Sequence, residues 1–129
     1  LLARGHRNPW LVETIAGRID ADGTAEGAAR RETEEEGGIA LGRLELVAGY
    51  YPTPGFAAEH LTAFVGEADL AGAGGTFGLV EENEDIRAFT LPLDEALAGV
   101  ASGEINSGPA VLTLPWLNLH RDRLRALWT

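Results

Sequence analysis

The pattern of hydrophobic and polar positions predicts strands that alternate with helices along the chain. Runs rich in aliphatic, aromatic and β-branched residues predict four short strands, at residues 11–16, 44–51, 60–65 and 86–91. The stretch 67–77 is rich in Ala and Gly and predicts a loop. Short strands of this kind need helices to cover them before they can bury an apolar face.

Helical periodicity follows the last predicted strand. Residues 92–100 place four apolar side chains on one face of a helix: Leu93, Ala96, Leu97 and Val100. Residues 109–128 are also helical in pattern, but Pro115 removes a backbone donor, so we expect this helix to be kinked or divided. The alternation predicts an α/β fold, in which a mixed sheet lies between helices as an α/β/α sandwich.

A third helical segment is strongly charged. Residues 25–36 are rich in Ala, Arg and Glu and contain no proline, which favours a helix. The Thr24 hydroxyl can accept a backbone N–H at the start of this helix. Gly37 and Gly38 can end it, because glycine adopts the left-handed conformation at little cost.

Three carboxylates share one side of that helix. Glu36 lies four residues after Glu32, and Glu35 lies three after it, so their like charges repel one another. A hard divalent cation such as Mg²⁺ or Mn²⁺ reverses this penalty, because it prefers oxygen ligands. The segment therefore predicts a metal-binding loop–helix–loop.

Two other interpretations compete with a magnesium site. A charge run on a helix is usually a solvated face, although the flanking glycines and Arg31 disfavour that reading here. A calcium loop that begins at Asp20 fails in detail, because its glycine position holds Ala25 and its glutamate position holds Arg31.

Composition and charge narrow the function classes. A chain of 129 residues is expected to be one domain, 1–129. The formal net charge of −10 argues against nucleic acid as the main partner, and the lack of cysteine excludes disulfides and zinc–thiolate sites. No apolar run reaches membrane-spanning length and no signal peptide is visible, so we expect no membrane partner and a cytoplasmic location.

The acidic segment also resembles a known motif. Residues 17–39 match the Nudix box, G-x5-E-x7-R-E-U-x-E-E-x-G-U with U apolar, at Gly17, Arg31, Glu32, Glu35, Glu36, Gly38 and Ile39. Thr33 fills an apolar slot, and Gly23 stands where the motif has its first glutamate. Asp22, which is shorter and one residue early, is the neighbouring acid that can partly substitute.

The resemblance implies a fold, a cofactor and roles for several residues. It implies a Nudix-type α/β/α sandwich and Mg²⁺, with Mn²⁺ as an alternative, held by the Ala16 carbonyl and by Glu32, Glu36 and Glu84. Glu35 would bind metal or orient its neighbours, and Arg31 would position Glu35 or Glu32 through charge-assisted hydrogen bonds.

A second motif narrows the resemblance. Residues 50–56, YYPTPGF, are similar to the SPG segment that follows the box in ADP-ribose pyrophosphatases, and Pro54 lies sixteen residues past Gly38. Alone, this segment indicates only a hairpin turn. The resemblance implies a substrate-binding segment composed of Thr53, Pro54, Gly55, Phe56 and Glu59.

The third motif is acidic. Residues 78–87, GLVEENEDIR, resemble the acidic loop of bacterial ADP-ribose pyrophosphatases, in which one glutamate is the catalytic base and another a metal ligand. By position these are Glu82 and Glu84. Hydrolysis of a diphosphate needs a base for the attacking water, and carboxylates that bind metal are poor bases.

Together, the motifs predict an Mg²⁺-dependent pyrophosphatase that splits ADP-ribose into AMP and ribose 5-phosphate. The alternatives are a hydrolase of another nucleotide sugar, an inactive Nudix domain that binds nucleotide or a protein partner, and a piece that folds only with a partner subunit. The resemblance also implies a homodimer. We expect the N-terminal domain that mediates dimerisation in full-length relatives to be absent.

Overall fold

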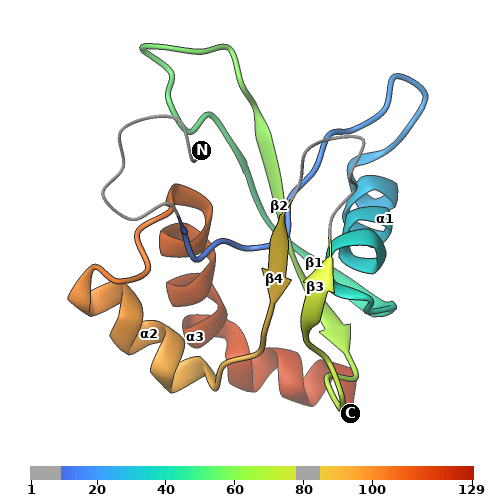
Figure 1. Ribbon diagram of the computed structural model, residues 1–129, viewed down its shortest axis with the longest axis vertical. Helices are drawn as coiled ribbons and strands as arrows, with labels where there is room; N and C mark the ends of the chain where they lie inside the picture. Colours follow the sequence, from blue (N-terminus) through green and yellow to red (C-terminus); the bar gives the residue numbers. More distant parts are fainter. Residues whose placement is uncertain (1–9, 78–84) are drawn as a thin grey trace.

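The computed structural model describes residues 10–77 and 85–129 of the chain. Their helices and strands follow one another as shown in Figure 1, with the bounds α1 (Ala25–Gly37), β1 (Leu41–Tyr50), β2 (Leu61–Ala68), β3 (Gly75–Phe77), β4 (Ile86–Ala88), α2 (Leu93–Ser102) and α3 (Gly108–Trp128). The predicted α/β class is therefore confirmed.

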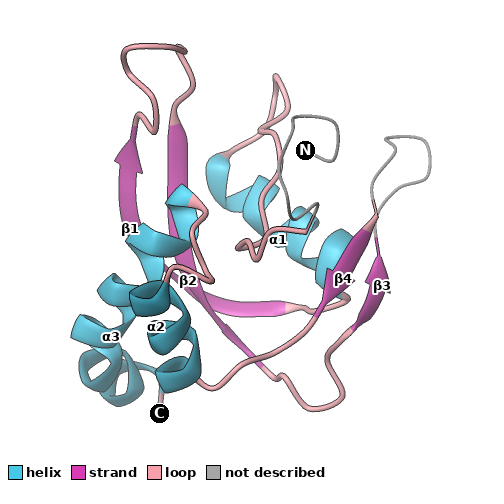
Figure 2. Ribbon diagram, turned by 60° about the vertical axis from the view of Figure 1, so that its left-hand side comes forward, coloured by secondary structure: helices cyan, strands magenta, loops and turns pink. Residues whose placement is uncertain are grey.

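The described strands form two antiparallel pairs. β1 pairs with β2 in a long hairpin, with Leu46 opposite Phe64 and Tyr50 opposite Leu61, and β3 pairs with β4 (Figure 2). Helix α1 contacts β1, β3 and β4, whereas α3 contacts β1, β2 and α2. Within the described residues both pairings are antiparallel, so the mixed sheet of the expected sandwich is not seen there.

The strand predicted at residues 11–16 is wrong, because residues 10–20 form no strand. The apolar side chains of this segment pack instead of pairing. Val12 packs against the small core of Ala96, Ile105 and Ala110, and its carbonyl accepts a hydrogen bond from the Ser107 hydroxyl at 3.1 Å. The segment is therefore fixed by contacts with the C-terminal helices.

The loop predicted at residues 67–77 is wrong in part. The hairpin strand β2 continues to Ala68, and β3 lies at the end of the stretch. Gly74 and Gly75 have φ of 127° and 136°, a backbone conformation that residues with a side chain rarely adopt. Gly75 begins β3, which forms by pairing with β4.

Of the two outcomes expected from Pro115, a kinked helix or a divided one, helix α3 is not divided. It runs without interruption from Gly108 to Trp128 with Pro115 inside it, and its ribbon changes direction along its length in Figure 1. A proline within a helix bends it by removing one hydrogen bond and crowding the preceding turn. None of the helices in the described ranges is both long enough and apolar enough to span a membrane.

Arg43 joins the hairpin to the end of α3. Its guanidinium donates two hydrogen bonds of 2.8 Å to Glu67 on the neighbouring strand. It also donates to the carbonyls of Leu127, at 3.2 Å, and of Trp128, at the C-terminal end of α3. A cation suits this position, because the last carbonyls of a helix lack intrahelical partners.

This arrangement predicts a pH dependence of stability. Hydrogen bonds from Arg43 lower the pKa of Glu67 from 4.5 to about 2. Since the folded pKa lies below the unfolded one, the stabilisation is complete above about pH 5 and is lost as the pH falls toward 2. Chemical unfolding at several pH values should therefore show Glu67→Gln less stable than the unmodified chain at pH 7, with the difference shrinking below about pH 4.5.

Glu34→Gln is the matched control for that measurement. The Glu34 side chain is exposed and makes no ion pair within the described residues, so its removal should change the stability less. A constant difference between Glu67→Gln and the unmodified chain from pH 7 to pH 2 would contradict the role of the Arg43 pair.

Candidate active site

Helix α1 begins and ends as its sequence predicts. The Thr24 hydroxyl accepts the Gly27 N–H at 3.0 Å, and Gly38 closes the helix with φ 64°. Thr33, in the apolar slot of the box, is buried, and its hydroxyl donates to the Ala29 carbonyl at 2.7 Å. Both ends of α1 are therefore capped, which fixes the part of the chain that carries Glu32, Glu35 and Glu36.

Arg30 ties this helix to the hairpin. Its guanidinium donates to the carbonyls of Leu41 and Gly42 at 2.8 and 2.9 Å, and it pairs with Glu26 one turn earlier. The next residue, Arg31, instead binds the loop that precedes the helix.

Gly17 lies directly against the carboxylate of Glu32. A Cβ atom built on Gly17 would lie 1.9 Å from Glu32 Cδ and 2.0 Å from its Oε1, closer than any real contact. Gly17 does not have a positive φ, so the glycine is required for space and not for backbone conformation. The first position of the box is therefore a socket for the Glu32 side chain.

Arg31 holds the loop and the Glu32 carboxylate together. Its Nη2 donates to Glu32 Oε1 at 2.7 Å and to the Arg18 carbonyl at 2.8 Å, and its Nη1 donates to Asp20 Oδ2 at 2.6 Å. The hydrogen bond to Glu32, together with the charges of Asp20, Glu32 and Glu35, raises the pKa of Arg31, although partial burial opposes this. The side chain of Glu32 is only 15% exposed, so its orientation is strongly constrained.

Glu36 lies beside the backbone of Ala16. Its Oε2 accepts the Ala16 N–H at 3.3 Å, so the carboxylates of Glu36 and Glu32 contact the adjacent residues 16 and 17. Ala16 and Glu36 also line a cavity of about 670 Å³, whose walls continue with Ile15, Ile86 and Phe89. Ligand pockets are typically about 300–1,000 Å³ in volume and mostly apolar.

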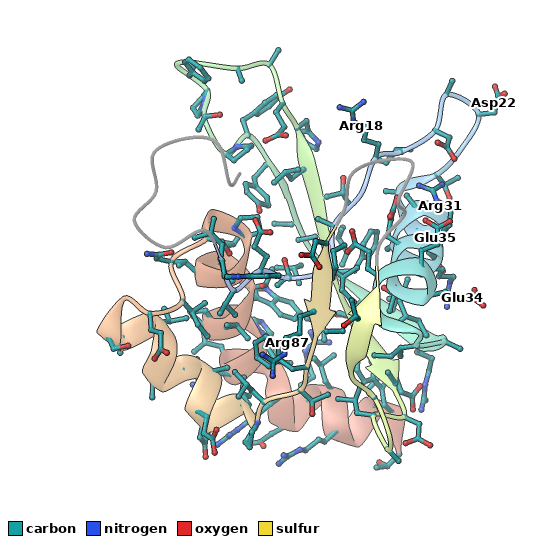
Figure 3. The ribbon with its side chains drawn as sticks, in the orientation of Figure 1. Arg18, Asp22, Arg31, Glu34, Glu35 and Arg87 are labelled. Carbon is teal, nitrogen blue, oxygen red and sulfur yellow. The ribbon has the colours of Figure 1, made fainter. Side chains whose placement is uncertain are left out.

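The other acids of the region have different surroundings. Glu35 is exposed and acts on Arg31 through its charge. Asp22 lies at the far end of the loop, away from Arg31, and Glu34 points outward from α1 (Figure 3). Asp22 and Glu34 therefore lie away from the contacts that Arg31, Glu32 and Glu36 make with the loop.

The donor chemistry around residues 16 and 17 suits a hard cation. The carboxylate of Glu32 lies against Gly17 and that of Glu36 accepts the Ala16 N–H, and carboxylate oxygens are ligands that Mg²⁺ accepts. The role of the Ala16 carbonyl as a ligand stays a prediction. Within residues 10–77 and 85–129 no group of three acidic or histidine side chains is arranged to hold a metal ion. The predicted base Glu82 and ligand Glu84 lie outside the described residues.

The predicted substrate segment lies at the end of the β1–β2 hairpin. The Thr53 carbonyl accepts the N–H groups of Phe56 and Ala57, both at 2.9 Å, and Phe56 is 93% exposed. Both views show this hairpin end apart from α1 (Figures 1 and 2). The structure does not bring Thr53, Pro54, Gly55, Phe56 and Glu59 to the box carboxylates, and their binding role stays a prediction.

Sequence reasoning missed Asp20 as the loop partner of Arg31. The available signal was an acid in the loop before the helix, three residues ahead of Gly23. In the sequence Asp20 fits only the first position of a calcium loop that fails elsewhere, since its pairing with Arg31 depends on how the loop folds back over α1. Only the three-dimensional structure selects Asp20 over Asp22.

The Gly17 socket predicts a selective defect. In Gly17→Ala the new methyl group would meet the flexible end of Glu32, so the carboxylate moves and the backbone does not. We expect Mn²⁺ binding, measured by calorimetry, to weaken by about 10- to 100-fold with little change in melting temperature. The control is Gly108→Ala, because a Cβ there has nothing within 4 Å. Unchanged Mn²⁺ affinity in Gly17→Ala would contradict the socket.

Comparison with known proteins adds a family to this geometry. The NUDIX domain family matches residues 1–111 of the chain. The ADP-ribose pyrophosphatase of Haemophilus influenzae is 40% identical over 123 residues, which are 95% of this chain. That of Escherichia coli K12 is 38% identical over 120 residues, or 93% of the chain. The GDP-mannose pyrophosphatase of Citrobacter koseri is 37% identical over 117 residues, or 88% of the chain.

The match covers these relatives only in part. The chain spans 57% of the length of the two ADP-ribose pyrophosphatases and 59% of the GDP-mannose pyrophosphatase. The box residues that build the socket and the Arg31 contacts lie within the range matched by the family. The chain belongs to the Nudix family and is related to ADP-ribose and GDP-mannose pyrophosphatases.

Proposed function

We propose that this chain is an Mg²⁺-dependent Nudix hydrolase that cleaves ADP-ribose into AMP and ribose 5-phosphate. The observation that carries the proposal is the placement of the Glu32 and Glu36 carboxylates against the adjacent residues 17 and 16, where Ala16 and Glu36 line a cavity. The choice of ADP-ribose is supported by the relatives of that name, which align with 95% and 93% of the chain.

The chain's own residues have distinct tasks in this mechanism. The cation would be held by Glu32, Glu36, Glu84 and the Ala16 carbonyl. When bound, it would polarise the diphosphate and lower the pKa of water. Glu82 accepts a proton from the water that attacks phosphorus, and the bridging P–O bond breaks to release the two monophosphates. Arg31 keeps the Glu32 carboxylate in place, and Glu35 tunes the charge around Arg31.

Several parts of the proposal concern the whole assembly. We assign substrate contacts to residues 53–56 and Glu59 of the hairpin, which requires this segment and the box to act on one ligand. We also propose that residues 1–129 form a single domain with the α/β/α sandwich fold.

The proposal includes a homodimer. Size-exclusion chromatography with light scattering measures the oligomeric state and tests it.

GDP-mannose is the second candidate substrate. The Citrobacter koseri relative of that name is nearly as similar to the chain as the ADP-ribose pyrophosphatases are, at 37% against 40% identity. Small changes in loops alter the substrate on a shared fold, so the box alone does not select the nucleotide.

The substrate prediction is tested by product release. Nucleoside monophosphate is measured from ADP-ribose, ADP-glucose and GDP-mannose, each with Mg²⁺ and with chelator. We expect Mg²⁺-dependent AMP release that favours ADP-ribose. Faster GMP release from GDP-mannose would move the assignment to the second candidate. Binding of ADP-ribose without release from any substrate would indicate an inactive binding domain.

Two glutamate variants separate the base from a metal ligand. Glu82→Gln should lower kcat by about 100-fold or more while leaving Mn²⁺ affinity unchanged, because the base acts on the water. Glu36→Gln should weaken Mn²⁺ affinity by about 10-fold or more, because it removes a charged oxygen ligand. Calorimetry and steady-state kinetics on the same samples check both. Equal losses of kcat and Mn²⁺ affinity in Glu82→Gln would remove the base assignment.

A further inference from the structure

We propose that Asp20 is the positioning residue that compensates for Gly23, the glycine found where the Nudix box has its first glutamate. In this view Asp20 holds Arg31, and Arg31 in turn fixes the Glu32 carboxylate. The catalytic consequence rests on the proposed function, whereas the positioning of Arg31 and Glu32 does not.

The contacts of Arg31 show how one acid can fix another through it. Asp20 binds Nη1 at 2.6 Å, while Nη2 is shared between Glu32, at 2.7 Å, and the Arg18 carbonyl. With both terminal nitrogens engaged, the planar guanidinium cannot rotate without breaking a hydrogen bond. Loss of Asp20 frees Nη1 and leaves the Glu32 contact on a side chain with more freedom.

The turn before α1 explains how Asp20 can replace an acid at position 23. The Gly23 N–H donates to the Asp20 carbonyl at 2.9 Å and closes a turn between them. A Cβ built on Gly23 would lie 3.6 Å from the Cβ of Asp20, so side chains at 20 and 23 leave the turn next to each other. Either position can therefore direct a carboxylate toward Arg31, and this chain uses position 20.

Asp22 does not have this geometry. It lies at the far end of the loop, away from Arg31 (Figure 3), and the acid paired with Arg31 across the loop is Asp20. The sequence suggested Asp22 as the substitute because it adjoins Gly23 in the chain. Closeness in the folded turn selects Asp20 instead.

The exposure of the pair points to orientation and not to stability. The Asp20 side chain is 73% exposed and that of Arg31 is 35% exposed, and ion pairs in such surroundings contribute little to folding. The Glu32 side chain at the other end of the relay is largely buried, so an error in its orientation is not easily relaxed by solvent. Removal of Asp20 should therefore disturb the site while the fold remains intact.

The test compares Asp20→Ala with Asp22→Ala, which removes the same charge from the same loop. Three properties are measured: Mn²⁺ affinity without substrate, kcat and KM for ADP-ribose, and rotation of the Arg31 guanidinium by ¹⁵N NMR without metal. Asp20→Ala should bind Mn²⁺ about 10-fold more weakly and lower kcat more than it raises KM. Its Arg31 guanidinium should rotate faster, with the melting temperature little changed. Asp22→Ala should change none of these.

Rescue variants test the exchange between positions 20 and 23. Asp20→Glu should retain most of the Mn²⁺ affinity, because it keeps a carboxylate in reach of Arg31. In the Asp20→Ala background, Gly23→Glu should restore the Mn²⁺ affinity to within about threefold of that of the unmodified chain. In the unmodified chain, Gly23→Glu alone should change the Mn²⁺ affinity by less than about threefold. Failure of this rescue would overturn the compensation of Gly23.

Other outcomes are equally decisive. Equal losses in Asp20→Ala and Asp22→Ala would show that only the loop's charge matters, and unchanged Arg31 rotation in Asp20→Ala would overturn the relay. If the unmodified chain cleaves no ADP-ribose, the proposed function fails, while the guanidinium and Mn²⁺ measurements still decide the role of Asp20. If it also binds no Mn²⁺, the guanidinium rotation alone decides that role.

Discussion

The close approach of Gly17 to the Glu32 carboxylate is the constraint on which the site depends. It allows the Glu32 carboxylate to lie against the loop backbone, at a distance from which a Cβ on residue 17 would displace it. Once the loop lies there, the Arg18 carbonyl can meet Arg31, and the Ala16 N–H can meet Glu36. The glycine thus sets the position of the Glu32 carboxylate on a loop whose neighbouring backbone groups bind Arg31 and Glu36.

Adjacent arginines divide the work of holding α1. Arg30 bonds to carbonyls of β1, whereas Arg31 bonds to the loop and to Glu32. Because successive residues of a helix point about 100° apart, one Arg-Arg step can serve the hairpin and the loop at once. The box carboxylates therefore lie on a helix that is bound to the hairpin on one side and to the loop on the other. These contacts limit how far the carboxylates can move apart, although their like charges repel one another.

Local chemistry explains which features were predictable from sequence. The start of α1 at Ala25, the Thr24 cap and the Gly38 end depend on neighbouring residues only, and all agree with the structure. The strand expected at 11–16 failed because its apolar side chains serve packing onto the C-terminal helices. β3 was missed because its pairing comes from β4, and Asp20 was missed because its partner lies eleven residues away. The roles of Glu82 and Glu84 remain predictions.

Thr33 shows what the apolar slot of the box tolerates. Its side chain is buried, and its hydroxyl donates a hydrogen bond within the same helix, to the Ala29 carbonyl. The slot thus accepts a hydroxyl that leaves no unsatisfied donor facing the strands. A consensus written in classes of hydrophobicity penalises this residue, whereas one written in terms of unsatisfied hydrogen-bonding capacity would count it as a match. Divergent members of the family would be recognised more readily on the second basis.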